Sequence, residues 1–157
     1  MKRILFSLIF LASACLVISS NAQQRSRQSK GNAASIEREV FRLINKKRSS
    51  SGKPALVIND VVSRLARSHS AAMASGKVRF GHAGFDDRSD QINARVGRIS
   101  GIAENVAIGS DAEAAVAMWW RSAGHKKNML GTYKQTGIGV ARKGTQWYFT
   151  QIFISKM

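Results

Sequence analysis

The chain has 157 residues and carries 25 basic against 9 acidic residues, a formal net charge of +16 at neutral pH. This length suits one domain, and the single cysteine excludes a fold that depends on disulfides. So large a positive surplus favours polyanionic surroundings: nucleic acid, acidic glycans, anionic lipid or anionic cell-wall polymer.

The first 22 residues have the pattern of a cleavable signal peptide. Lys2 and Arg3 give a positive start, an apolar run covers residues 4–18, and small residues precede a cleavage point after Ala22. The run is shorter than the roughly 20 residues that span a bilayer. A lipoprotein site with Cys15 acylated ranks second, ahead of an uncleaved anchor. The sequence therefore predicts a secreted, periplasmic or cell-envelope protein that is at most peripheral to a membrane.

Export also narrows the choice of partner. Removal of residues 1–22, which hold two basic residues and no acidic one, lowers the net charge to +14 and removes the only cysteine. We expect an exported protein of this charge to meet anionic envelope polymer or lipid, and no nucleic acid. Residues 23–34 are polar and basic without periodicity, and they are predicted to be a disordered linker before a domain at residues 35–157.

Four segments of this domain have apolar residues at helical spacing. They are residues 35–48, a second helix capped by Asn59 or Asp60 and closed by Gly76, a looser amphipathic stretch at residues 88–99, and residues 111–121.

The last part of the chain has the pattern of strands. Residues 137–141 and 146–154 are rich in β-branched and aromatic side chains, and residues 142–145 join them as a hairpin turn. Both faces of the second strand are largely apolar, so we expect helices on both sides of the sheet. The pattern predicts an α+β fold, a three-layer α-β-α sandwich with a central antiparallel sheet.

Three histidines and one glutamate are candidates for a functional site. His69 lies on the apolar stripe of the second helix and is interpreted as a core residue. His82 lies in a glycine-rich loop, and His125 follows a glycine at a loop or a helix start. Glu104 is flanked by apolar residues, so its carboxylate is either buried with partners or lines a pocket. Spacing alone does not join these residues, because the zinc motif His-Glu-x-x-His is absent.

Six short motifs follow one another between residues 36 and 154. They are Leu43-Ile44-Asn45-Lys46-Lys47-Arg48, Leu65-Ala66-x-x-His69-Ser70, Phe80-Gly81-His82, Glu104-Asn105-Val106-Ala107, Ser122-x-Gly124-His125-x-x-Asn128 and the hairpin of residues 137–153. Together they resemble the CAP, or SCP-like, superfamily of cysteine-rich secretory proteins, insect venom antigens and plant pathogenesis-related proteins, and its bacterial branch in particular.

The resemblance implies an α-β-α sandwich in which His82, Glu104 and His125 meet in a central cleft. Two neutral imidazoles and a carboxylate suit zinc or another divalent metal, with one position left open. Animal and plant members often add a second glutamate three residues after a helix tryptophan. Counted from Trp119, that position holds Ser122, so the four-residue site is incomplete.

The sequence leaves several functions open. We expect an exported, non-enzymatic binding module with a His/Glu cleft able to hold a divalent metal. One alternative is a metal-assisted hydrolase of an envelope or extracellular substrate, in which Glu104 activates water on the metal. Another is a lipid or sterol binder, as the resemblance implies for some relatives. A purely structural histidine cluster is the last. No separate base or oxyanion group is evident, so no catalytic residue is assigned.

Overall fold

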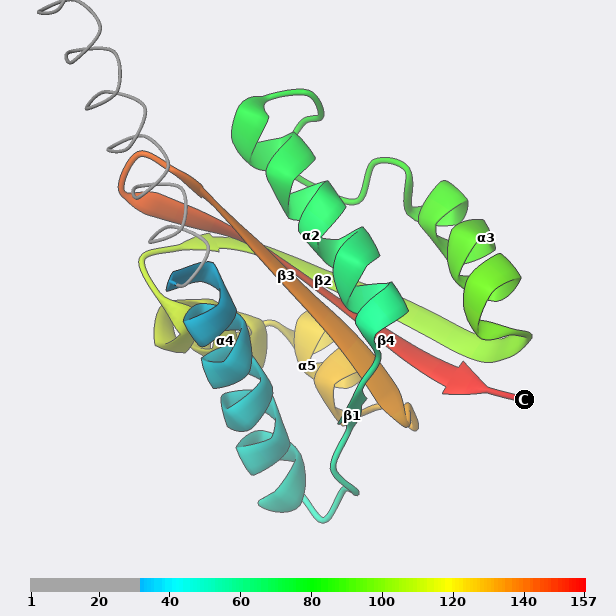
Figure 1. The fold of residues 1–157 in the computed structure, drawn as a ribbon. Coiled ribbons are helices and arrows are strands. Elements are labelled where there is room, and N and C mark those ends of the chain that lie inside the picture. The colour runs from blue at the N-terminus through cyan, green and yellow to red at the C-terminus, as the bar shows by residue number, and fades with distance from the viewer. Residues whose placement is uncertain (1–31) are drawn as a thin grey trace, which may run out of the picture. The chain divides into compact units, whose positions relative to one another are not determined.

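The computed structural model describes residues 32–157, so the predicted signal peptide and residues 23–31 of the predicted linker lie outside it. Residues 35–157 form one compact unit, built as a sheet between two layers of helices (Figure 1). None of the helices described is long and apolar enough to cross a membrane.

Five helices and four strands make up the described chain. In order they are a helix at residues 32–49, β1 (Val57–Ile58), α2 (Asp60–Ser75), α3 (Phe85–Val96), β2 (Ile99–Gly109), α4 (Ala112–Arg121), α5 (Ala123–Leu130), β3 (Gln135–Lys143) and β4 (Gln146–Lys156). The first helix begins at residue 32, within the last three residues of the predicted linker.

The strands form one mixed sheet in the order β1-β3-β4-β2. The predicted hairpin is confirmed, because β4 pairs antiparallel with β3, and β4 also pairs antiparallel with β2. The short strand β1 pairs parallel with β3, through Val57↔Gln135 and Ile58↔Thr136. The predicted antiparallel sheet is therefore correct for three strands and wrong at the β1 edge.

Side chains that alternate along β4 divide the core between the two helical layers, with aliphatic residues on one face and aromatic rings on the other. Figure 1 shows these layers on the two sides of the sheet. Ile152 and Ile154 pack with buried residues of α2 and α3. Phe149 and Phe153 alternate with these two residues and face the other side of the sheet. The ring of Phe149 contacts Trp119 on α4, and the ring of Phe153 contacts Tyr133 just after α5. This arrangement confirms the three-layer sandwich, because successive side chains of a strand point to opposite faces.

Helix α2 begins and ends where the sequence predicts. Asn59 Oδ1 accepts hydrogen bonds from the backbone N–H groups of Val61 and Val62, at 3.0 and 3.2 Å. Gly76 ends the helix with a φ of +78°, a left-handed conformation that favours glycine. The looser stretch predicted at residues 88–99 is α3, which lies three residues earlier along the chain.

Helix α2 lies directly against β3 at two glycines. A Cβ atom at Gly137 or Gly139 would collide with the backbone of Ser63 or Arg67, respectively. The Ser70 hydroxyl hydrogen-bonds with the carbonyl oxygen of Gly139, at 2.9 Å. The height of α2 above the sheet is therefore fixed by backbone contact.

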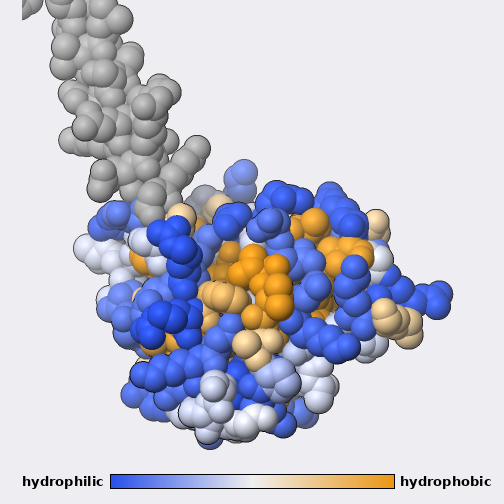
Figure 2. All heavy atoms as spheres, turned by 60° about the horizontal axis from the view of Figure 1, so that its bottom comes forward, coloured by the Kyte–Doolittle hydropathy of each residue, from blue (hydrophilic) through white to orange (hydrophobic). Residues whose placement is uncertain are grey.

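Few large apolar side chains remain exposed in residues 32–157. The largest exposed fractions belong to Val57 (62%), Phe80 (51%) and the C-terminal Met157 (79%). Figure 2 shows one face on which hydrophilic side chains surround a central apolar area.

Candidate functional site

Glu104 and His82 form the centre of the candidate site. Glu104 lies in the middle of β2 and is 6% exposed, whereas the side chain of His82, in the loop before α3, is 51% exposed. His82 Nδ1 lies 2.9 Å from Glu104 Oε1. A carboxylate oxygen accepts hydrogen bonds, so Nδ1 carries the hydrogen in this contact and Nε2 lies on the far side of the ring.

Arg88 of α3 holds the same carboxylate with two parallel hydrogen bonds. Its Nε donates to Glu104 Oε2 at 2.9 Å and its Nη2 donates to Oε1 at 2.8 Å. Arg88 itself is only 7% exposed. Such a bidentate pair fixes the orientation of the carboxylate. Both oxygens of Glu104 are therefore used inside the protein.

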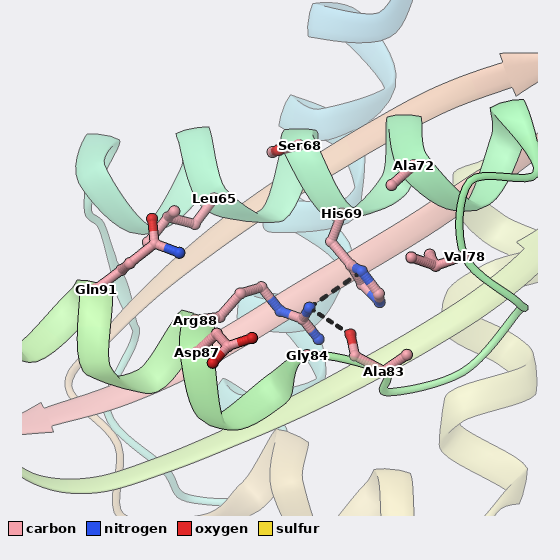
Figure 3. Close-up of a pocket in the computed structure, with 10 residues that line it drawn as sticks. All are labelled: Leu65, Ser68, His69, Ala72, Val78, Ala83, Gly84, Asp87, Arg88 and Gln91. Carbon is pink, nitrogen blue, oxygen red and sulfur yellow. Dashed lines mark hydrogen bonds between the residues drawn. The ribbon is translucent and has the colours of Figure 1, made fainter.

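His69 extends this polar cluster away from the cleft. Arg88 Nη1 lies 3.1 Å from His69 Nδ1 and donates to the carbonyl oxygen of Ala83 at 2.8 Å (Figure 3). His69 Nε2 lies 2.8 Å from the carbonyl oxygen of Gly81. Since a guanidinium only donates, Nδ1 accepts and Nε2 donates, which requires a neutral ring. Burial lowers the pKa of His69, and the charge of Arg88 lowers it further. The predicted burial of His69 is confirmed, but both of its nitrogens make polar contacts.

His125 lies in α5 and is near the cluster without being bonded to it. Burial lowers the pKa of His125, and the nearby His82 lowers it further. Its Nδ1 is buried without a hydrogen-bond partner among the described residues. The backbone of α5 is tied to β2, because Asn105 donates to the carbonyl oxygen of His125 at 3.2 Å. The structure thus joins His82 to Glu104 directly and places His125 close by.

Ser122 stands at the position where the family resemblance implies a second glutamate in animal and plant members. It caps the N-terminus of α5, and its side chain makes no capping hydrogen bond. A serine here adds no carboxylate to the cleft.

Two cavities lie on either side of the Arg88–Glu104 pair. One, of about 260 Å³, is lined by His82, Phe85, Ile102, Ala103, Glu104 and Asn128. A second of about 260 Å³ lies between α2 and α3, with Arg88 and His69 among its lining residues (Figure 3). The first, which we call the cleft, is lined by two of the side chains that the sequence singles out, His82 and Glu104, and not by His125.

The residues of the cleft do not fit a divalent metal ion in this arrangement. Among residues 32–157, no group of three or more His, Cys, Asp or Glu side chains is placed to hold one. Arg88 occupies both oxygens of Glu104, and its positive charge beside the carboxylate disfavours a second cation. The ligand set of His82, Glu104 and His125 is therefore not preassembled.

Comparison with known proteins decides the family. Residues 41–153 match the family described as CAP, the cysteine-rich secretory protein family. The chain belongs to the CAP family. This CAP domain is 31% identical, over 127 residues, to the uncharacterized protein YkwD of Bacillus subtilis strain 168, covering 78% of the chain and 48% of YkwD.

Solved structures support the same assignment. An extracellular protein with an SCP domain from Bacillus anthracis has a TM-score of 0.73 and 28% identity, over 83% of this chain and 43% of that one. The chain therefore spans less than half the length of this protein and of YkwD. NaASP2, whose crystal structure contains Zn²⁺, shares the fold with a TM-score of 0.55 and 16% identity, over 75% of this chain and 78% of that one.

Proposed function

We propose that this CAP domain is an exported, non-enzymatic binding module. Its cleft holds a small neutral ligand that donates hydrogen bonds, and its positive charge retains it on anionic envelope polymer. The observation that carries the proposal is the complete internal use of the Glu104 carboxylate by Arg88 and His82. A carboxylate held in this way contributes shape and tautomer control to the cleft instead of reacting with a substrate.

The groups that remain open in the cleft are hydrogen-bond acceptors. His82 Nε2 accepts when its ring is neutral. Asn128 uses its Nδ2 hydrogens on Asn105 Oδ1, at 2.9 Å, and on the carbonyl oxygen of Glu104, at 3.4 Å, so its Oδ1 remains available. Phe85 and Ile102 add apolar wall. Two acceptors beside an apolar wall suit a hydroxyl-bearing molecule with an apolar face, such as a sugar unit.

The geometry supports binding better than metal-assisted hydrolysis. A hydrolase of that kind needs a metal site and a carboxylate free to activate water. Arg88 holds Glu104 in an ion pair instead, with a separation of 2.8 Å. No observation on the described residues favours a lipid or sterol ligand. If the wild type hydrolysed an envelope substrate and both His82→Ala and His125→Ala lost this activity, the proposal of a non-enzymatic binding module would be overturned in favour of a hydrolase.

A titration with N-acetylglucosamine oligomers, as neutral hydroxyl-bearing probes, tests the cleft. We expect His82→Phe to weaken binding about tenfold, because it removes one hydrogen-bond acceptor and keeps a ring. Arg79→Gln is the matched control, since Arg79 is an exposed residue of the same loop that does not line the cleft. Equal affinity for the wild type and His82→Phe, or no binding by the wild type, would overturn the proposed ligand class.

Export is tested by the mass of the mature protein. The family name describes secretory proteins, and the Bacillus anthracis relative is described as extracellular. These names support secretion. Cleavage after Ala22, as the sequence pattern predicts, would give a chain that begins at Gln23. An acylated chain that begins at Cys15 would establish the lipoprotein interpretation instead.

A further inference from the structure

A tryptophan outside the cleft holds two lysines. Trp120, at the end of α4, is half-buried where the helix of residues 32–49 and α5 meet it. Lys47 Nζ, from the first helix, lies 4.7 Å from the centre of the indole ring, and Lys126 Nζ, from α5, lies 4.4 Å from it. We call Lys47, Trp120 and Lys126 the lysine clamp.

The positive charges of this clamp are held in place but not neutralised. The two ammonium groups can be no farther apart than the sum of their distances to the ring, about 9 Å. Within residues 32–157 neither lysine forms an ion pair. Attraction to the face of the indole ring reduces the freedom of both side chains. A polyanion that binds there therefore meets two charges that are already positioned, at little cost in side-chain entropy.

The surroundings of the clamp add to its charge. Lys46 and Lys127, which adjoin it in sequence, are exposed and form no ion pair within the described chain. Met118, the exposed apolar residue of α4, is two positions from Trp120, a spacing at which helical side chains do not face each other. The two lysines of the clamp, with Lys46 and Lys127, thus give this region four positive charges, which favours a polyanionic ligand.

We propose that the lysine clamp is the docking site for a phosphate-bearing envelope polymer. The inference rests on the proposed retention on anionic polymer and assigns that retention to three residues. A polymer with a phosphate in every repeat can present neighbouring anions to Lys47 and Lys126 at once. A single free phosphate engages the clamp once and is held more weakly.

Binding to poly(glycerol phosphate), followed from 50 to 300 mM salt, tests the proposal with the full exported chain. The variant Lys47→Gln/Lys126→Gln removes both charges of the clamp. The matched control, Lys143→Gln/Lys156→Gln, makes the same change in net charge at exposed residues near the ends of β3 and β4. A third variant, Trp120→Leu, keeps both charges and removes the ring that positions them.

We expect the clamp variant to lose at least tenfold in affinity at 150 mM salt and the control less than threefold. The slope of log affinity against log salt should fall by about 1 for each lysine that contacts a phosphate, and only in the clamp variant. Trp120→Leu should give an intermediate loss. Equal losses in the two double variants would overturn the clamp while leaving polymer retention intact.

Two other outcomes separate the sources of failure. A wild-type protein that does not bind the polymer at any salt concentration would overturn polymer retention itself, and the clamp with it. The clamp variant could instead lose binding to vesicles of phosphatidylglycerol and phosphatidylcholine and bind the polymer as the wild type does. That result would assign the clamp to a membrane surface and overturn this proposal. His82→Phe should retain polymer binding, because the cleft is not part of the clamp.

Discussion

Two arginines of the domain are buried, but their charges are compensated in different ways. Arg48, at the end of the first helix, is 1% exposed, and Arg88, in the site, is 7% exposed. Arg88 pairs with a carboxylate. Arg48 pairs with no carboxylate of residues 32–157 and donates instead to four backbone carbonyl oxygens, at 2.8–3.2 Å, those of Pro54, Met129, Gly131 and Tyr133.

The difference separates a structural arginine from one that belongs to a site. The carbonyl partners of Arg48 lie in the loop before β1 and around the end of α5, where the negative pole of a helix favours a cation. Burial lowers the pKa of Arg48. Arg88 is matched by a side chain that lines the cleft, so a change at Arg88 alters the chemistry of a ligand-facing group. The two environments make different predictions for the same substitution.

The largest expected effect is that of Arg48→Met. The substitution leaves four carbonyl groups without their donor in a closed part of the core, which should lower the free energy of unfolding by about 4 kcal/mol. Urea unfolding measures this change. Arg64→Met, at an exposed position of α2, is the control and should change it by less than about 0.5 kcal/mol. A loss below about 1 kcal/mol for Arg48→Met would show that water replaces the guanidinium.

Arg88→Met should lower the free energy of unfolding by about 3 kcal/mol at neutral pH, because it leaves the buried charge of Glu104 unpaired. Adding Glu104→Gln should recover much of that loss, which no second side-chain change can do for Arg48. A double-mutant cycle with urea unfolding would then give a coupling energy of about 2 kcal/mol. Additive effects of the two substitutions would contradict the ion pair.

Zinc binding sharpens the comparison further. We expect the wild-type protein to retain no stoichiometric zinc, whereas Arg88→Met frees Glu104 and His82 to act as ligands. Zinc at ten times its dissociation constant should then raise the free energy of unfolding of that variant by about 1.4 kcal/mol. Adding His82→Ala to Arg88→Met should abolish the gain. Stoichiometric zinc in the wild type, lost in His82→Ala, would mean that Arg88 moves aside for a metal.

The smallest expected effect is a dependence on pH. Burial lowers the pKa values of His69 and His125 below the ordinary value of 6.5, so the unfolded chain binds more protons than the native one as the pH falls below that value. The contribution of these two histidines to the free energy of unfolding should therefore be complete above pH 6.5. It should decline as the pH falls toward the native pKa values. His69→Gln should flatten this decline in urea titrations at several pH values. An unchanged decline in that variant would assign the effect to other groups.

Helices and strands with strong local signals could be predicted from the sequence. The caps at Asn59 and Gly76 place α2 correctly, and the aromatic and β-branched run of β4 predicts its strand. Strand β2 was not predicted, because Glu104 and Asn105 interrupt its apolar pattern at the centre. Those two residues are polar because they serve the cleft and tie β2 to α5. The two residues of β1 are too few for any periodic pattern.

The site could be predicted only in part. His82 and Glu104 were singled out from their surroundings and from the family resemblance. Arg88 was missed, because in a chain with 25 basic residues nothing in the sequence separates a buried guanidinium from an exposed one. Its partner Glu104 lies 16 residues away on another element, so only the packing of α3 against β2 makes the pair.

The two glycines of β3, Gly137 and Gly139, limit which amino-acid substitutions this protein can tolerate. Any side chain at Gly137 or Gly139 would push α2 off the sheet. Because α2 carries His69, that displacement would disturb the contact of His69 with Arg88, the partner of Glu104, although neither glycine lines the cleft. Random mutagenesis should therefore produce loss-of-binding variants at positions remote from any ligand, and a library meant to alter ligand choice should keep these two codons fixed.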